Sequence, residues 1–308
     1  MTSIGIGLVG IGAIARNEHV PTIAARNDVT LVATASRNAS LDGVPAYRDV
    51  GEMLDAEPGI DAVALTAPPG PRFAMAREAI ARGKHIMLEK PPGATLAEVA
   101  MLREAAEAAG MTLHATWHSQ HAAAVEAARE MLEGIGIASV AVTWREDVRK
   151  WHPGQEWVWD AGGFGVFDPG INALSILTHI LPEAMRLRRA SLEVPEGRQT
   201  PIAASCALEM TGGAPVTLDL DWRQEGPQTW DIVIETEVGT MRLSEGGARL
   251  EANGSPVEVV QQSEYASVYD MFVRLVREGA SNVDTDPLVH VADAILLGER
   301  RAVVPFEW

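Results

Sequence analysis

Residues 4–15 read "IGIGLVGIGAIA", an apolar run that ends in closely spaced small residues. The first part, 4–10, is predicted to be a β-strand, and Gly10, Gly12 and Ala15 follow in the spacing G-x-G-x-x-A. At such a turn the first glycine permits the tight bend, the second lets a pyrophosphate approach the backbone, and the alanine allows close helix–strand packing. The N-terminus of the next helix then attracts phosphate. The stretch predicts a dinucleotide-binding turn.

The chain that follows this turn alternates short β-branched runs with longer Ala-rich segments of helical periodicity. Such alternation requires crossover connections and a parallel sheet, so residues 1–120 are predicted to form a Rossmann dinucleotide-binding domain. Beyond 4–10, the expected strands are 30–35, 61–67, 85–88 and 112–116, and the clearest helices are 71–83 and 95–110.

The pattern changes near residue 137, where strands with alternating polar residues are separated by turns rich in Gly and Pro. This alternation is typical of an antiparallel sheet with one buried face. We therefore expect an α/β domain followed by an α+β domain, 121–308, whose sheet is mostly antiparallel. Its expected strands are 137–148, 187–194, 202–210, 215–224, 229–237 and 239–246, and a helix at 263–279 is expected to close the chain.

Composition limits the class of protein. The chain has 308 residues, 47% of them hydrophobic, and a net charge of −17, which argues against nucleic acid or an anionic membrane as a partner. The single cysteine, Cys206, cannot form an internal disulfide and lies in an apolar run, so it is predicted to fill the core. The N-terminus lacks a signal-peptide pattern and no apolar stretch could span a bilayer, so a soluble cytoplasmic protein is expected.

The end of the second predicted strand bears on which dinucleotide is bound. A site that prefers NAD usually places an acid there, to bind the ribose 2′-hydroxyl. This chain instead has Ser36 and Arg37, a hydroxyl and a permanently charged guanidinium that suit a 2′-phosphate. The alternative is that Arg37 is a solvated loop residue. We predict NADP as the preferred cofactor, with NAD tolerated.

Two further motifs carry a family resemblance. The sequence Glu89–Lys90–Pro91 follows the fourth predicted strand, and G-G-x-x-x-x-D-x-G spans 162–170. With the N-terminal turn, they resemble the Gfo/Idh/MocA oxidoreductases over essentially the whole chain. The segments 87–96, 115–119, 146–157 and 165–176 are similar to the bacterial L-arabinose/D-galactose 1-dehydrogenases, which oxidise the sugar at C1 to the aldonolactone with NAD(P)+. The resemblance implies an open-faced second sheet that binds the sugar and forms a homodimer or homotetramer.

The predicted catalytic residues are Lys90, Asp168 and Asn172. Lys90 lies at the carboxyl end of a parallel strand, where open α/β sheets bind ligands, and a neighbouring cationic nicotinamide would lower its pKa. Asp168 lies in an apolar run, where an unpaired charge is costly. The family often has D-x-G-x-H, but this chain has Asn172 in place of the histidine. Because an amide cannot take a proton, Asn172 is expected to orient the substrate, and Lys90 or Asp168 to accept the proton.

A sugar site needs hydrogen-bonding groups and an aromatic plate. Glu146 and Asp147 are expected to accept hydroxyl hydrogens, and Trp151 and Trp230 to stack, although tryptophan more commonly lies in the core. His118 is read either as a sugar partner or as a satisfied structural histidine. No metal is expected at His114, His118 and His121, because His114 lies in a predicted strand and His118 follows its end, so they do not share one helix face.

The expected function is oxidation of L-arabinose, D-galactose or both at C1. Alternatives are another aldose such as D-xylose or L-fucose, a cyclitol, a dihydrodiol, or a non-catalytic protein that senses NADP. Substrate contacts are predicted at His118, Glu146, Trp151, Asp168, Asn172 and Trp230. Cofactor contacts are predicted at Gly10, Gly12, Ile14, Ala15, Ser36, Arg37, Ala67, Pro68, Glu89 and Lys90.

Overall fold

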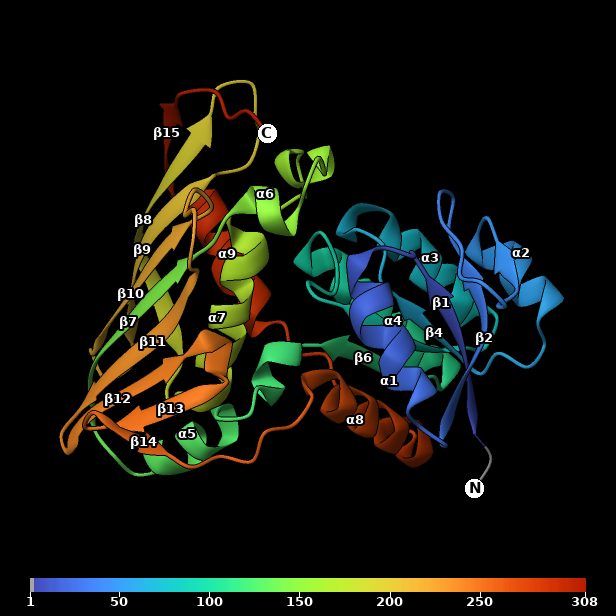
Figure 1. The fold of residues 1–308 in the computed structure, drawn as a ribbon, viewed down its shortest axis with the longest axis horizontal. Coiled ribbons are helices and arrows are strands. Elements are labelled where there is room, and N and C mark those ends of the chain that lie inside the picture. The colour runs from blue at the N-terminus through green and yellow to red at the C-terminus, as the bar shows by residue number, and fades with distance from the viewer. Residues whose placement is uncertain (1–2) are drawn as a thin grey trace. The chain divides into compact units, whose positions relative to one another are not determined.

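The computed structural model describes residues 3–308, which form two compact units (Figure 1). The first unit contains the chain up to Trp117 together with Tyr265–Thr285, and the second contains His118–Glu264 and Asp286–Trp308. The predicted domains, 1–120 and 121–308, are each one continuous stretch of chain. The first unit of the structure differs, because it also contains Tyr265–Thr285.

The first unit is built on a six-stranded sheet in the order β3-β2-β1-β4-β5-β6, with every neighbouring pair parallel. Its order reverses between β1 and β4, which creates the switch point outside which doubly wound sheets bind ligands. All five strands predicted in this part form, and the two-residue β3 was not predicted. The strands are β1 (Ile4–Val9), β2 (Val29–Ala35), β3 (Ala46–Tyr47), β4 (Ala62–Leu65), β5 (His85–Glu89) and β6 (Leu113–Thr116).

Helices cover both faces of this sheet. One face packs against α2 (Val50–Ala56), α3 (Pro69–Ala81) and α4 (Leu96–Ala109). The other face receives only the short η1 (Ala15–His19) and α1 (Val20–Ala24) from the N-terminal chain, and α8 (Glu264–Glu278) completes its cover. The predicted helix 263–279 therefore exists, but it packs on the dinucleotide-binding sheet and does not close the chain.

The second unit is built on a nine-stranded sheet in the order β14-β13-β12-β11-β7-β10-β9-β8-β15. The pairs β7–β10 and β8–β15 are parallel and the other pairs are antiparallel, as predicted for this part of the chain. The strands are β7 (Ile137–Arg145), β8 (Met185–Pro195), β9 (Ala203–Met210), β10 (Pro215–Asp221), β11 (Thr229–Thr236), β12 (Gly239–Ser244), β13 (Arg249–Ala252), β14 (Ser255–Val257) and β15 (Glu299–Val303).

The helices of this unit gather on one face of the sheet, and the described part of the chain leaves the other face without a helix (Figure 1). Gly170 shows how closely helix and sheet pack, because a Cβ at this position would lie 2.6 Å from Leu220. Cys206 is buried on β9, as predicted, and burial raises the pKa of its thiol to about 12. The helical segments are η2 (His118–His121), α5 (Val125–Leu132), α6 (Val148–Trp151), η3 (Glu156–Trp159), α7 (Phe167–Ile180), η4 (Glu245–Gly247) and α9 (Asp286–Leu297).

The chain ends differently from the prediction, because α9 and β15 follow α8 and belong to the second unit. Among residues 3–308, no helix combines the length and the apolar composition that crossing a bilayer requires.

Candidate active site

The Gly-rich turn lies at the switch point of the first sheet. Gly10 has a φ of +95°, and a Cβ there would lie 2.5 Å from the backbone nitrogen of Ala67, so only glycine fits. At Gly12 no heavy atom lies within 4 Å of the position of a Cβ, so the backbone is open to a ligand. Ala15 is fully buried against the sheet. These features fit a dinucleotide pyrophosphate at this turn.

Two arginines lie near the loop that follows β2. Arg37 is exposed directly after the strand, and the backbone N–H of Ser36 donates to Tyr47 on β3. Arg16, on η1, donates from Nη2 to the carbonyl of Ser40 at 2.9 Å. The loop therefore has a guanidinium at its start and a second one bonded to its backbone. Sequence reasoning selected Arg37 and missed Arg16.

Lys90 follows β5, at the carboxyl end of that strand. The buried Arg72 of α3 donates hydrogen bonds to the backbone carbonyls of Ala67, Glu89 and Pro91. Because a guanidinium carries several donors in a fixed plane, Arg72 holds the segments after β4 and β5 together. Arg72 was not predicted. Its signal in the sequence is an arginine at a position of α3 that faces the core.

Asp168 lies in the first turn of α7 and is 6% exposed. Its Oδ2 is 3.1 Å from Nε2 of His152, the residue that ends α6. From the sequence, Asn172 replaces the family's histidine, and the proton was expected to pass to Lys90 or Asp168. The structure adds a histidine that was not predicted, because His152 from another element pairs with the carboxylate.

Glu146 follows β7 and is 5% exposed. Its two oxygens accept hydrogen bonds from the indole N–H groups of Trp222, at 3.2 Å, and Trp230, at 3.0 Å. Burial raises the pKa of Glu146 to about 7; the charge of Asp168 adds to the rise, and the two indole bonds oppose it. Glu146 is therefore divided between its protonated and ionised forms near neutral pH.

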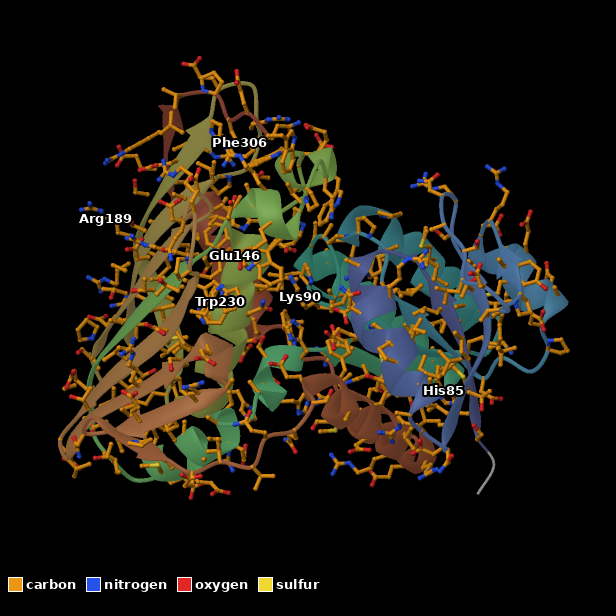
Figure 2. The ribbon with its side chains drawn as sticks, in the orientation of Figure 1. His85, Lys90, Glu146, Arg189, Trp230 and Phe306 are labelled. Atoms are coloured by element: carbon orange, nitrogen blue, oxygen red, sulfur yellow. The ribbon has the colours of Figure 1, made fainter. Side chains whose placement is uncertain are left out.

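Aromatic side chains surround these two acids. Trp230 lies beside Glu146 (Figure 2), and its ring centre is 5.6 Å from that of Trp151, which is 42% exposed. The ring of His152 is 5.4 Å from Trp222. The structure thus brings Glu146, Asp168, Trp151 and Trp230 of the predicted site into one neighbourhood of the second unit, and adds His152 and Trp222.

The remaining polar residues considered from the sequence are His118, Asn172 and His114, and each has a defined contact. His118 lies on η2, and its Nδ1 is 2.6 Å from a carboxylate oxygen of Glu264. Asn172 is half-buried on α7, one turn beyond Asp168, and its carbonyl accepts from Ser175. His114 lies on β6, where its ring stacks on Phe272. Within residues 3–308 no three side chains of metal-binding type are grouped to hold a metal ion.

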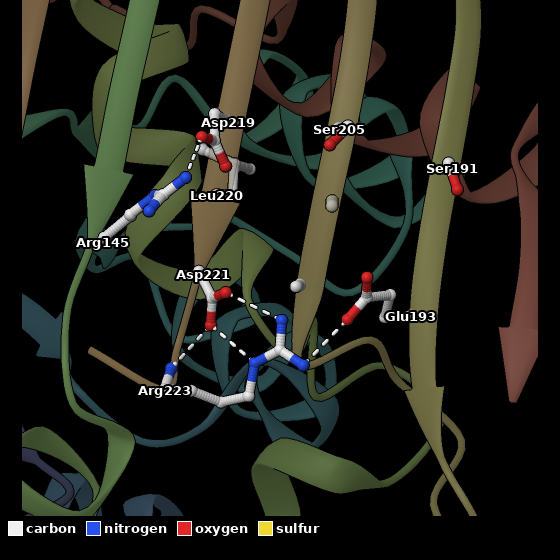
Figure 3. Close-up of a pocket in the computed structure, with 10 residues that line it drawn as sticks. Arg145, Ser191, Glu193, Ser205, Asp219, Leu220, Asp221 and Arg223 are labelled. Atoms are coloured by element: carbon white, nitrogen blue, oxygen red, sulfur yellow. Dashed lines mark hydrogen bonds and ion pairs between the residues drawn. The ribbon is translucent and has the colours of Figure 1, made fainter. Parts of the chain in front are cut away.

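The helix-free face of the second sheet has a shallow hollow with a different chemistry (Figure 3). Arg145 pairs with Asp219 there, and Arg223 bridges Asp221 and Glu193. These opposite charges neutralise each other across the sheet, from β7 to β10 and from the end of β10 to β8. The hollow therefore has the character of a paired-charge surface and lacks the buried acids and indoles found beside Glu146.

Comparison with known proteins agrees with this organisation. Residues 4–117 match the model of the GFO_IDH_MocA oxidoreductase family, with its NAD-binding Rossmann fold. The chain is 43% identical to galactose 1-dehydrogenase of Pseudomonas fluorescens, over 99% of both chains. It superposes on the crystal structure of a D-galactose-1-dehydrogenase protein from Rhizobium etli with a TM-score of 0.94 and 52% identity, covering 100% of this chain and 99% of that one.

A more distant structure shares only the fold. A Tyr-to-Phe mutant of the 3-ketoreductase KijD10 from Actinomadura kijaniata, solved with TDP-benzene and NADP, matches with a TM-score of 0.86 and 19% identity, over 98% of this chain and 100% of that one. The chain belongs to the Gfo/Idh/MocA family of oxidoreductases, and its N-terminal unit is an NAD-binding Rossmann fold. The predicted family and fold class are confirmed.

Proposed function

We propose that this protein is an aldose 1-dehydrogenase that oxidises D-galactose, and also L-arabinose, at C1 to the aldonolactone, with NADP+ preferred and NAD+ tolerated. The observation that carries the proposal is the full-length similarity to two galactose 1-dehydrogenases, at 43% and 52% identity. It is supported by the chemistry of the second unit, where buried acids lie among indole rings.

The groups around Glu146 suit a pyranose, which offers several hydroxyls and one apolar face. Ionised Glu146 accepts sugar hydroxyl hydrogens, and the exposed ring of Trp151 stacks on the apolar face with Trp230 beside it. His118, with Nδ1 held by Glu264, orients a further hydroxyl. Asn172 donates from its amide, one helical turn beyond Asp168.

The reaction removes a hydride from C1 of the sugar and a proton from its hydroxyl. Lys90 in its neutral form accepts the proton, and Asp168 tunes Lys90 or relays the proton. His152, paired with Asp168, steadies the carboxylate and is a second proton carrier at this point. Asn172 fixes the hydroxyl, which compensates for the histidine that the family often has at its position.

The cofactor fits the turn at Gly10 and Gly12, and Ile14, Ala15, Ala67, Pro68 and Glu89 complete its proposed contacts. When bound, the dinucleotide supplies the acceptor for the hydride. Arg37, with Ser36, binds the 2′-phosphate, and Arg16 adds positive charge to the same loop.

Steady-state kinetics of the purified protein test the proposal. D-Galactose, L-arabinose, D-xylose and L-fucose are each offered with NADP+ and with NAD+, and reduced nicotinamide is followed by absorbance. We expect the highest kcat/KM for D-galactose with NADP+. A higher kcat/KM for another sugar would mean that this sugar is the substrate. Tight cofactor binding without turnover of any aldose would favour a sensing protein.

Replacement of the proposed base is the first prediction. Lys90→Met keeps the length of the side chain and removes its amine, so kcat should fall by roughly 100-fold to 10,000-fold, the usual contribution of general acid–base catalysis. NADPH binding, measured by fluorescence, should persist. The matched control is Lys84→Met at the opposite end of β5, where the lysine donates to the carbonyl of Ile60. Near-normal turnover of Lys90→Met would exclude Lys90 as the base.

The helix-free face of the second sheet is our proposed surface for a homodimer or homotetramer. It alternates paired charges with small residues, and Arg189 projects from it (Figure 2). Light scattering during size-exclusion chromatography measures the number of chains directly.

A further inference from the structure

A buried polar cluster in the first unit has no part in the proton transfer as proposed. It consists of His19, Glu89, Tyr265 and Tyr269, which are 0%, 4%, 3% and 0% exposed. His19 ends η1, just after the Gly-rich turn; Glu89 ends β5, beside Lys90; and both tyrosines lie on α8. Three segments distant in the sequence therefore meet at one buried carboxylate.

The hydrogen bonds of this cluster converge on Glu89. Its Oε1 accepts from the hydroxyl of Tyr265 at 2.7 Å and lies 3.1 Å from Nε2 of His19. Its Oε2 accepts the backbone N–H of Lys90 at 3.0 Å. Nδ1 of His19 in turn bonds the hydroxyl of Tyr269 at 2.9 Å. Glu89 thus connects the Lys90 backbone to α8 and to the end of the cofactor-binding turn.

Ring packing accompanies the hydrogen bonds of this cluster. The ring of His19 meets the two tyrosine rings edge-on, at 5.1 Å from Tyr265 and 5.7 Å from Tyr269. Burial is the largest cause that raises the pKa of Tyr269, and the charge of Glu89 adds to it, so this hydroxyl keeps its proton. A buried carboxylate with this many fixed partners has one stable orientation.

We propose that Tyr265 and His19 are positioning residues for Lys90 and act through the Glu89 carboxylate. The inference rests on the proposed function, in which Lys90 accepts the proton. Glu89 holds the amide of Lys90, while Arg72 holds the carbonyls of Glu89 and Pro91. Catalysis depends on such fixation, because a base displaced by about 1 Å can lose roughly 100-fold in rate.

Tyr265→Phe is the decisive variant, because it keeps the ring that packs on His19 and removes only the hydroxyl that bonds Glu89. We expect kcat for D-galactose to fall roughly 10-fold to 100-fold while the KM for the dinucleotide stays within about twofold. Rates are divided by the number of cofactor-binding sites, titrated by fluorescence, so partial misfolding does not imitate the effect. Glu89→Gln should lower kcat by a similar factor; because Glu89 is also a proposed cofactor contact, its dinucleotide KM does not enter the test.

The matched control is Tyr47→Phe, which removes another tyrosine–glutamate hydrogen bond of 2.7 Å in the same unit, from Tyr47 to Glu57. Its kcat should remain that of the wild type. Sugar deuterated at C1 supplies a second readout, because slower chemistry leaves the isotope effect on kcat at least as large as in the wild type.

The positioning role is overturned if kcat per site in Tyr265→Phe stays within about twofold of the wild type. An equal loss in Tyr47→Phe, or a smaller isotope effect in Tyr265→Phe, would also overturn it. Failure of the proposed function gives a different result, because the wild type itself would then turn over no aldose.

Discussion

Burial and hydrogen bonding have opposite effects on the pKa of Glu146. The carboxyl is 5% exposed, yet it has two indole donors that favour its ionised form. The effect of burial is larger than that of the two indole bonds, and the pKa rises from 4.5 to about 7. A shift of this size corresponds to about 3 kcal/mol, which the folded protein gives up when Glu146 ionises. The residue therefore costs stability at high pH.

The sign of this effect gives a testable pH dependence. The folded state binds the Glu146 proton more tightly than the unfolded state, so this group's contribution to stability is lost as pH rises from about 4.5 to about 7. Glu146→Gln has no carboxyl proton to lose, so this loss of stability is absent from the variant. The free energy of unfolding of the variant minus that of the wild type should therefore be larger at about pH 8 than at about pH 5, by up to about 3 kcal/mol. Urea unfolding of both proteins at the two pH values measures it.

The glutamine amide also loses one indole bond, because its NH₂ cannot accept a hydrogen bond from Trp222 or Trp230. That cost is the same at both pH values and cancels in the comparison. An identical stability difference at the two pH values would show that Glu146 titrates well below neutrality.

Single residues were predictable from the sequence where chemistry made them conspicuous. Asp168 stood out as an acid in an apolar run, and Glu146 and Trp230 as partners suited to a sugar. His152 was missed because its pairing with Asp168 joins the end of α6 to the start of α7, and no local pattern encodes that contact. Glu89 was assigned to the cofactor, and its bonds to Tyr265 and His19 depend on where α8 packs.

The loop after β2 is the element that should decide between the two dinucleotides. Its Arg37 is proposed to pair with the 2′-phosphate, and a hydrogen bond to a charged group contributes about 1.5–3 kcal/mol. Arg37→Ala should therefore raise the KM for NADP+ roughly 10-fold to 100-fold and leave that for NAD+ nearly unchanged. Arg103→Ala, an exposed arginine on α4, is the control. Equal changes for both cofactors would mean that Arg37 does not contact the 2′-phosphate.

Helices and strands with a clear hydrophobic periodicity were predicted well. Short strands, and strands that pair with a distant part of the chain, were not. The five longer strands of the first sheet and the six strands from 137 to 246 are in place, because alternation and β-branched runs mark them clearly. The strands β13, β14 and β15 were not predicted, because they are short and β15 pairs with a strand about a hundred residues away. The periodicity of α8 predicted a helix, but periodicity does not say which sheet the helix covers.

At the scale of the whole molecule, the fold of the first unit explains why it needs α8. Its crossovers place α2, α3 and α4 on one face and leave the other to the short η1 and α1. Four buried apolar residues of α8 complete that second face: Val268, Tyr269, Phe272 and Val273. At about 1.5–3 kcal/mol for each, their burial is worth roughly 6–12 kcal/mol, as much as the entire stability of many domains.

A fragment that ends at residue 120 should therefore fail to fold, although it contains the complete six-stranded sheet. A fragment that joins residues 3–117 to 265–285 through a flexible Gly/Ser linker should fold and unfold cooperatively in urea, as followed by circular dichroism. The same linked fragment with Phe272→Asp, which buries a charge in that face, should behave like the shorter one. Cooperative unfolding of the shorter fragment at the same urea midpoint would mean that α8 adds nothing to the stability of the sheet. Its role would then be confined to the hydrogen bonds that Tyr265 and Tyr269 make beside Lys90.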